Sequence, residues 1–228
     1  MKTILAALLF AISTLPAMAQ SRPVVLELFT SQGCSSCPPA DALLAELAGR
    51  DDVIALAFHV DYWDYIGWKD PFALAGSTLR QKAYVQALGL RGLYTPQMVV
   101  DGIVDVVGYD RGRILPLLGP RAGIVAIGLR REGDEVVVSL GAGQGAGPVT
   151  AFGVQSQART LARRGENAGR TLIEAQIVRG FRPLGIWTGA AEEIRLKRSM
   201  LPADISQVVV VVQKDGPGPV LGVGRLGL

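Results

Sequence analysis

The chain contains two cysteines, Cys34 and Cys37, and only Ser35-Ser36 separates them. This spacing lets the two sulfurs form a disulfide within one short loop, and such a pair can exchange electrons with another thiol or disulfide. A purely structural disulfide is the less favoured interpretation, because a loop this short constrains the unfolded chain only weakly. The other alternative is that the two cysteines supply two of the ligands of a metal site. The pair predicts redox chemistry.

The cysteines lie where a strand passes into a helix. The apolar run from Val24 to Phe29 predicts a buried strand, and the helical spacing from Ala40 to Ala48 predicts a helix after them. Unpaired N–H groups of a first helical turn stabilise a thiolate. We therefore predict that Cys34 is the attacking thiol and faces solvent, whereas Cys37 is buried and resolves the mixed disulfide.

Alternating strand and helix signals continue to about residue 120, which predicts an α/β domain over residues 20–120. The segments predicted after the cysteines are a strand from Val53 to Val60, a helix from Leu79 to Leu88, a hairpin of Gln97–Val100 and Ile103–Val107 around Asp101-Gly102, and a short helix from Asp110 to Leu118.

Residues 121–228 show a different pattern, with short β-rich runs divided by Gly, Pro and Asp and no convincing helix. This pattern predicts a second, antiparallel and sandwich-like β domain. The glycine-rich segment from Gly141 to Pro148 is predicted to be a loop. The predicted strands are Val125–Leu129, Val136–Leu140, Val149–Val154, Leu172–Val178, Val208–Val212 and Val220–Val223.

Several distinctive motifs follow one another along the chain. In chain order they are Leu26 to Asp41 (which includes Cys34-Ser35-Ser36-Cys37-Pro38-Pro39), His59 to Asp64, Gly67 to Phe72, Arg80-Gln81 and Tyr94 to Gln97. With these motifs the chain resembles a family of secreted bacterial thioredoxin-like proteins of unassigned function. The resemblance runs from about Pro23 to the C-terminus and implies a thioredoxin-like domain followed by a β-rich region, without implying a substrate.

Thr95-Pro96 falls where the thioredoxin order of elements places a cis-proline, directly before the hairpin and opposite the cysteines. Such a bond would lay backbone beside the disulfide, where an extended substrate can pair with it. An X-Pro bond is the peptide bond for which the cis geometry costs little free energy relative to trans. An ordinary trans proline that opens a strand is the alternative for Pro96.

Two further titratable residues are candidates for the site. Glu27 can take the proton of Cys37 during resolution if burial raises its pKa, and a salt-bridged or outward-facing Glu27 is the alternative. His59 is the only histidine, and we predict a structural role for it, with acid–base assistance as one alternative. The other is a soft-metal site that joins His59 to Cys34 and Cys37. An aromatic segment, predicted to overhang the cysteines, contains Tyr62, Trp63, Tyr65 and Trp68.

The N-terminus predicts export. Lys2 precedes an apolar run from Ile4 to Leu15, and Ala17-Met18-Ala19 is a small-x-small site, so we expect a signal peptide over residues 1–19 that is cleaved after Ala19. An uncleaved anchor is the alternative. No later segment is long and apolar enough to span a bilayer, which predicts a periplasmic or secreted protein without stable membrane insertion after cleavage.

The charge pattern gives no case for a nucleic-acid partner. The formal net charge is only +3, and we interpret the one group of basic residues as a solvated loop. That group consists of Arg159, Arg163, Arg164 and Arg170.

These observations support three functional hypotheses. The first is an exported thiol–disulfide oxidoreductase that uses Cys34 and Cys37 on protein thiols, works with an unknown redox partner and needs no cofactor. The second is a periplasmic copper-binding module that uses Cys34, Cys37 and His59. The third is an inert scaffold that binds a partner protein.

Overall fold

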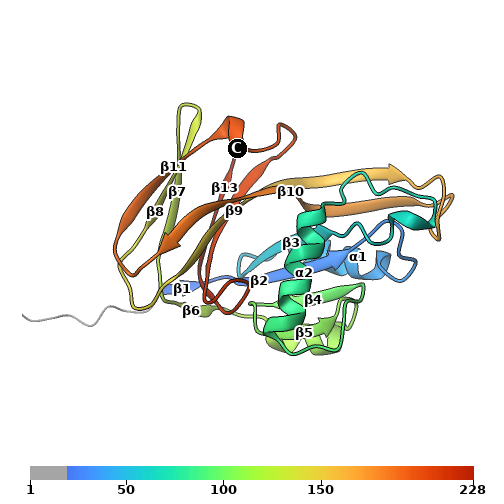
Figure 1. The fold of residues 1–228 in the computed structure, drawn as a ribbon, viewed down its shortest axis with the longest axis horizontal. Coiled ribbons are helices and arrows are strands. Elements are labelled where there is room, and N and C mark those ends of the chain that lie inside the picture. Colours follow the sequence, from blue (N-terminus) through green and yellow to red (C-terminus); the bar gives the residue numbers. More distant parts are fainter. Residues whose placement is uncertain (1–19) are drawn as a thin grey trace, which may run out of the picture.

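A computed structural model describes residues 20–228 as a mixed, strand-rich α/β fold (Figure 1). The predicted signal peptide and its cleavage after Ala19 lie outside the described residues. No helix among residues 20–228 has the length and apolar character needed to cross a membrane.

The strands predicted in the first half form the core of one large sheet. β2 (Val24–Thr30) pairs in parallel with β3 (Val53–His59) and antiparallel with β4 (Gln97–Val100), which continues into β5 (Val104–Val107). The predicted hairpin turn at Asp101-Gly102 is confirmed, because both residues have positive φ, at 55° and 73°.

Helices α1 (Pro38–Leu47) and α2 (Ala75–Ala87) cover opposite faces of this sheet. α1 begins earlier than predicted, because prolines are tolerated in a first helical turn. The predicted helix from Asp110 to Leu118 is a short α3 (Arg111–Ile114) that tightens into the 3₁₀ turn η2 (Leu115–Leu117) at Pro116. Further 3₁₀ turns are η1 (Asp64–Ile66) and η3 (Arg198–Met200).

The second half consists of strands, as predicted, but it continues the sheet of the first half. The order of the large sheet is β13-β12-β9-β10-β3-β2-β4-β5, and β10 joins β3 in parallel where Ile177 faces Ala57. The predicted domain boundary at residue 120 therefore does not separate two independent sheets, because strands from both halves of the chain belong to one large sheet. The strands are β9 (Gly147–Leu161), β10 (Thr171–Trp187), β12 (Gln207–Gln213) and β13 (Val220–Gly227).

A three-stranded sheet packs on the β9 and β12 part of the large sheet and buries a separate apolar cluster. Its strands are β7 (Ile127–Glu132), β8 (Glu135–Leu140) and β11 (Glu192–Lys197), of which β11 was not predicted. β1 (Gln20–Arg22) and β6 (Arg121–Gly123) form a separate two-stranded antiparallel sheet.

The hairpin of β9 and β10 is much longer than the runs Val149–Val154 and Leu172–Val178 predicted. Leu161 pairs with Thr171 at its far end, well beyond the residues of β9 and β10 that pair with β12 and β3. In Figure 1 this hairpin passes over α1 and ends near the start of that helix. The β-rich half therefore reaches the segment that contains the cysteines.

Candidate redox site

Cys34 and Cys37 form a disulfide between β2 and α1, with their Cα atoms 5.4 Å apart. Cys37 is the N-cap residue of α1, and its carbonyl accepts hydrogen bonds from the N–H groups of Ala40 and Asp41. The Ser36 hydroxyl lies 3.4 Å from the Cys34 sulfur. The predicted pairing at the start of a helix is confirmed.

The disulfide is covered, contrary to the prediction that Cys34 faces solvent. Cys34 is 1% exposed and Cys37 0%, whereas Ser35 and Ser36 are exposed. The sulfurs therefore lie beneath the surface, and the loop between them forms the accessible edge of the site.

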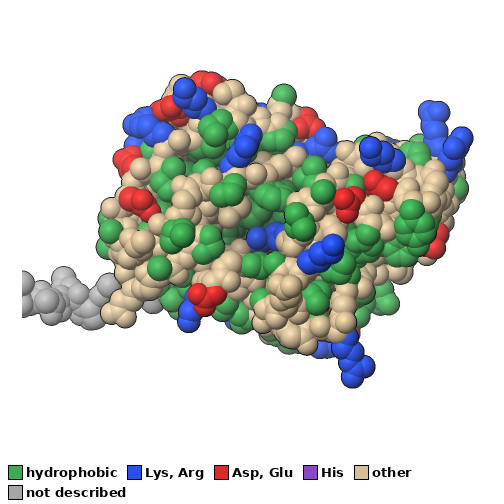
Figure 2. All heavy atoms as spheres, in the orientation of Figure 1, with side chains coloured by type: hydrophobic (Ala, Val, Ile, Leu, Met, Phe, Trp, Pro, Cys, Tyr) green, Lys and Arg blue, Asp and Glu red, His purple; other side chains and the backbone are tan. Residues whose placement is uncertain are grey.

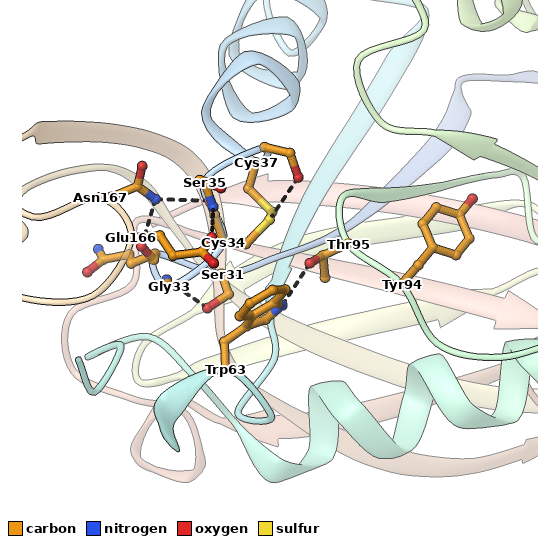
Figure 3. The surroundings of a disulfide bond; sticks show 12 residues. Ser31, Gly33, Cys34, Ser35, Cys37, Trp63, Tyr94, Thr95, Glu166 and Asn167 are labelled. Carbon is orange, nitrogen blue, oxygen red and sulfur yellow. Dashed lines mark hydrogen bonds between the residues drawn. A yellow bond between two sulfur atoms is a disulfide. The ribbon is translucent and has the colours of Figure 1, made fainter. Parts of the chain in front are cut away.

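Trp63 is one of the residues that cover the site. A Cβ built on Gly33 would lie 2.9 Å from the Cβ of Trp63, so this tryptophan packs directly on the loop before Cys34. Its indole N–H donates to the Thr95 hydroxyl at 2.8 Å (Figure 3). Trp63 thus bridges the cysteine loop and the Thr95-Pro96 segment, as expected of an aromatic insertion that overhangs the cysteines.

The Thr95-Pro96 bond is cis, as predicted. A Cβ on Gly108 would contact Pro96 at 3.1 Å and Ala40 of α1 at 3.0 Å, so Pro96 lies beside the beginning of the helix that carries Cys37. Figure 3 shows Thr95 close to the disulfide. The fold therefore brings the predicted proline segment and the cysteines together.

The tip of the β9–β10 hairpin also belongs to the site, which sequence reasoning missed. The Asn167 side-chain amide donates to the carbonyl oxygens of Gln32 and Cys34, at 2.9 Å each, and Asn167 is 0% exposed (Figure 3). The Glu166 carboxylate accepts from the Ser35 N–H at 3.0 Å. Hydrogen bonds from Ser35 lower the pKa of Glu166, which keeps its negative charge at the edge of the loop.

No local signal could have revealed these contacts, because Asn167 and Cys34 are 133 residues apart in sequence. The positive φ of Gly165 and Gly169, at 76° and 81°, indicates only that the chain turns sharply here. Which segment the turn would touch depends on how the long hairpin packs across α1.

His59 is buried and paired with a carboxylate. Its Nδ1 lies 2.7 Å from Asp70 Oδ2, and the same oxygen accepts from the Gln32 N–H at 2.9 Å. Burial by itself would lower the pKa of His59, but the carboxylates of Asp70, Glu174 and Asp41 together outweigh burial and raise it, with Asp70 contributing most. This geometry fits the structural role predicted for His59, because the pair anchors the segment that leads to the cysteines.

Two further acids surround His59, and neither was predicted as part of a site. Burial raises the pKa of Asp41 on α1 to about 6, and it raises the pKa of Glu174 on β10 to about 7. In both cases the positive charge of His59 opposes the effect of burial. The fold thus gathers groups that can exchange protons near neutral pH behind the cysteine loop.

Glu27 is engaged on the face of the sheet that α2 covers. Its carboxylate accepts two hydrogen bonds from the Arg80 guanidinium, at 2.5 and 2.7 Å, and one from the Tyr84 hydroxyl at 2.6 Å. The neighbouring residues Leu26 and Leu28 face α1 instead, since side chains alternate along a strand. Glu27 therefore matches the salt-bridged alternative rather than a proton acceptor for the cysteines.

The candidate metal ligands are not brought together. Within residues 20–228, no group of three His, Cys, Asp or Glu residues has an arrangement suited to a metal ion. Cys34, Cys37 and His59 therefore do not form a ligand set in the fold described above.

One comparison with known proteins identifies a family, and none assigns an activity. The family model described as a protein of unknown function (DUF1223) matches residues 25–213. The crystal structure of protein AGR_C_4864 from Agrobacterium tumefaciens is similar, with 32% identity, a TM-score of 0.78 and coverage of 91% of this chain and 96% of that chain.

HBP35 of Porphyromonas gingivalis is similar in fold, with 16% identity, a TM-score of 0.62 and coverage of 91% of this chain and 76% of that chain. No curated protein matches the chain. Since the family model spans most of the sequence, from β2 to β12, the chain belongs to the DUF1223 family of proteins of unknown function.

Proposed function

We propose that this protein is an exported thiol–disulfide oxidoreductase, in which residues 20–120 are a thioredoxin-like unit and Cys34–Cys37 is the reactive pair. The observation that carries the proposal is the disulfide at the N-terminus of α1 beside the cis Thr95-Pro96 segment. This combination supplies both an electron-exchanging pair and a stretch of backbone next to it that an extended substrate can approach.

The proposed reaction moves two electrons and needs no cofactor. The thiolate of reduced Cys34 attacks one sulfur of a substrate disulfide, which breaks that bond and releases the other sulfur as a thiolate. The Cys37 thiolate then attacks the Cys34 sulfur of the mixed disulfide, which releases the second substrate thiol and restores the Cys34–Cys37 disulfide. The substrate gains two electrons and two protons, and the cysteine pair loses them.

The surroundings of the pair favour the thiolate of Cys34. The Ser36 hydroxyl is close enough to donate to the sulfur, and the N-terminus of α1 lies next to it. Asp41, whose pKa of about 6 allows proton exchange near neutral pH, is in the first turn of the same helix. We assign proton uptake and release to the acids around His59 instead of to Glu27.

Burial of the disulfide adds a requirement to this function. A protein substrate reaches Cys34 only after Trp63 or the hairpin tip moves aside, because the sulfurs lie below the surface. Exchange with large partners is therefore expected to include a local opening step, whereas a small reductant needs a smaller opening.

The test is capture of partners by a resolving-cysteine variant. Cys37→Ala should leave Cys34 able to attack but unable to be released, so mixed disulfides should accumulate on non-reducing gels and disappear on reduction. The matched Cys34→Ala variant should trap little. Equal trapping by both variants, or by neither when circular dichroism shows an intact fold, would refute the assigned roles. The reduction potential of the pair then gives the direction of electron flow.

A further inference from the structure

Four exposed arginines form a ridge on the far part of the β9–β10 hairpin. We call them the arginine ridge, and they are Arg159, Arg163, Arg164 and Arg170. None of them forms an ion pair with a residue of the described chain. Exposed arginines elsewhere are of both kinds: Arg111, Arg130 and Arg195 are paired with carboxylates, whereas Arg131 and Arg225 form no ion pair within the described chain. What distinguishes the ridge is that its unpaired arginines are concentrated between residues 159 and 170 of one hairpin, which makes a local patch of positive charge.

The ridge stands directly beside the cysteine loop. Arg170 donates to the side-chain oxygen of Asn167 at 2.9 Å, and Asn167 in turn donates to the Cys34 carbonyl. Between residues 159 and 170 the one acidic residue is Glu166, which is bound to the Ser35 N–H. In Figure 2, Lys and Arg side chains gather at the end of the molecule where this hairpin turns.

We propose that the arginine ridge is the docking surface for an acidic protein surface that carries the disulfide or dithiol exchanged with Cys34–Cys37. The proposal rests on the redox function proposed above and names the charge of its partner. A body that approaches the exposed Ser35-Ser36 edge comes next to the hairpin tip that carries the ridge, because Glu166 and Asn167 of this tip are bonded to the cysteine loop. Guanidinium groups bind carboxylates in bidentate geometry. A patch of one sign also steers an oppositely charged partner and raises association rates by about 10- to 1,000-fold at low salt.

The experiment compares two peptides that carry the same intramolecular disulfide, one flanked by Asp and Glu and the other by Lys. Their second-order rate constants with the reduced protein are measured from about 0.01 M to 1 M salt, over which the Debye length falls from about 30 to 3 Å. The acidic peptide should react at least about tenfold faster at low salt, and the two rates should converge at high salt. Neutral hydroxyethyl disulfide serves as a probe of the thiol chemistry alone.

Charge reversal identifies the responsible side chains. The triple variant R159E/R163E/R164E, which leaves Arg170 and its bond to Asn167 in place, should lose or invert the preference and keep the wild-type rate with hydroxyethyl disulfide. The matched control R131E/K197E/R225E reverses three exposed cations on β7, β11 and β13, and it should keep the preference.

The outcomes distinguish failure of the docking proposal from failure of the proposed redox function. Reaction with hydroxyethyl disulfide but equal rates for both peptides would refute the docking surface alone. No reaction with any disulfide would refute the redox function and the docking proposal together. Salt-dependent binding of the wild type to phosphatidylglycerol vesicles, lost in the triple variant without any peptide preference, would assign the ridge to a lipid surface and overturn the proposal.

Discussion

Asn167→Ala should both destabilise the protein and expose its disulfide. The substitution removes the donor for the Gln32 and Cys34 carbonyls, in a place where all three residues are buried. A buried polar group left without its partner costs about 1–3 kcal/mol, so the two carbonyls together predict a loss of about 2–4 kcal/mol, with entry of water moderating the upper value. This is a large share of the stability of an ordinary domain, which is about 5–15 kcal/mol.

The assay is urea unfolding of the oxidised protein, with the free energy of unfolding taken from the midpoint and slope. A second readout is the rate at which a small phosphine reduces the disulfide, which should rise because the hairpin tip no longer holds the cysteine loop. Asn167→Asp is the matched variant: it keeps an oxygen for Arg170 but turns a carboxylate toward two carbonyls, so it should destabilise at least as much.

Glu166→Gln provides the control at the neighbouring position. Its amide oxygen can still accept from the Ser35 N–H, and the residue is exposed, so its free energy of unfolding should agree with that of the wild type within the error of the measurement. The reasoning would be refuted if Asn167→Ala unfolded within that same margin of the wild type and its disulfide were reduced no faster. Such a result would mean that the hairpin tip does not hold the cysteine loop in solution.

Three other predictions test separate parts of the site. Trp63→Phe should speed reduction of the disulfide by a small phosphine several-fold, and Thr95→Val should match it, because each removes the same bridge; unchanged rates would contradict the covering role. Burial raises the pKa of Glu174 from 4.5 to about 7, so the folded state holds a proton that the unfolded state releases, and wild-type stability should fall as pH rises through this window. Urea midpoints of Glu174→Gln across the same pH range should show a flatter profile, by up to a few kcal/mol, and an identical profile would contradict the shift. Glu27→Gln should cost about 3–5 kcal/mol in urea unfolding at pH 7, because it leaves the charge of Arg80 nearly buried and unpaired; a loss below about 1 kcal/mol would show that the ion pair is dispensable.

Local patterns in the sequence were sufficient for much of the fold. Apolar runs, turn residues and helical spacing predicted β2, β3, β4 and the turn at Asp101-Gly102, because these features depend on the dihedral preferences and burial of neighbouring residues. The Cys-x-x-Cys spacing predicted the disulfide, since both sulfurs belong to one short loop. The order of elements also predicted the cis geometry of Thr95-Pro96.

Only the tertiary structure decided which residues surround the disulfide. In the sequence, Glu27 lies within an apolar run that predicts a buried strand, and this run does not indicate what the Glu27 carboxylate contacts. The ion pair with Arg80 of α2 is visible only in the folded structure. The contact between Asn167 and the cysteine loop depends on a hairpin that extends across α1, and no periodicity encodes a contact between residues 133 positions apart. Burial of Cys34 follows from the same packing, because the covering groups come from distant segments that approach the loop only when the whole sheet is formed.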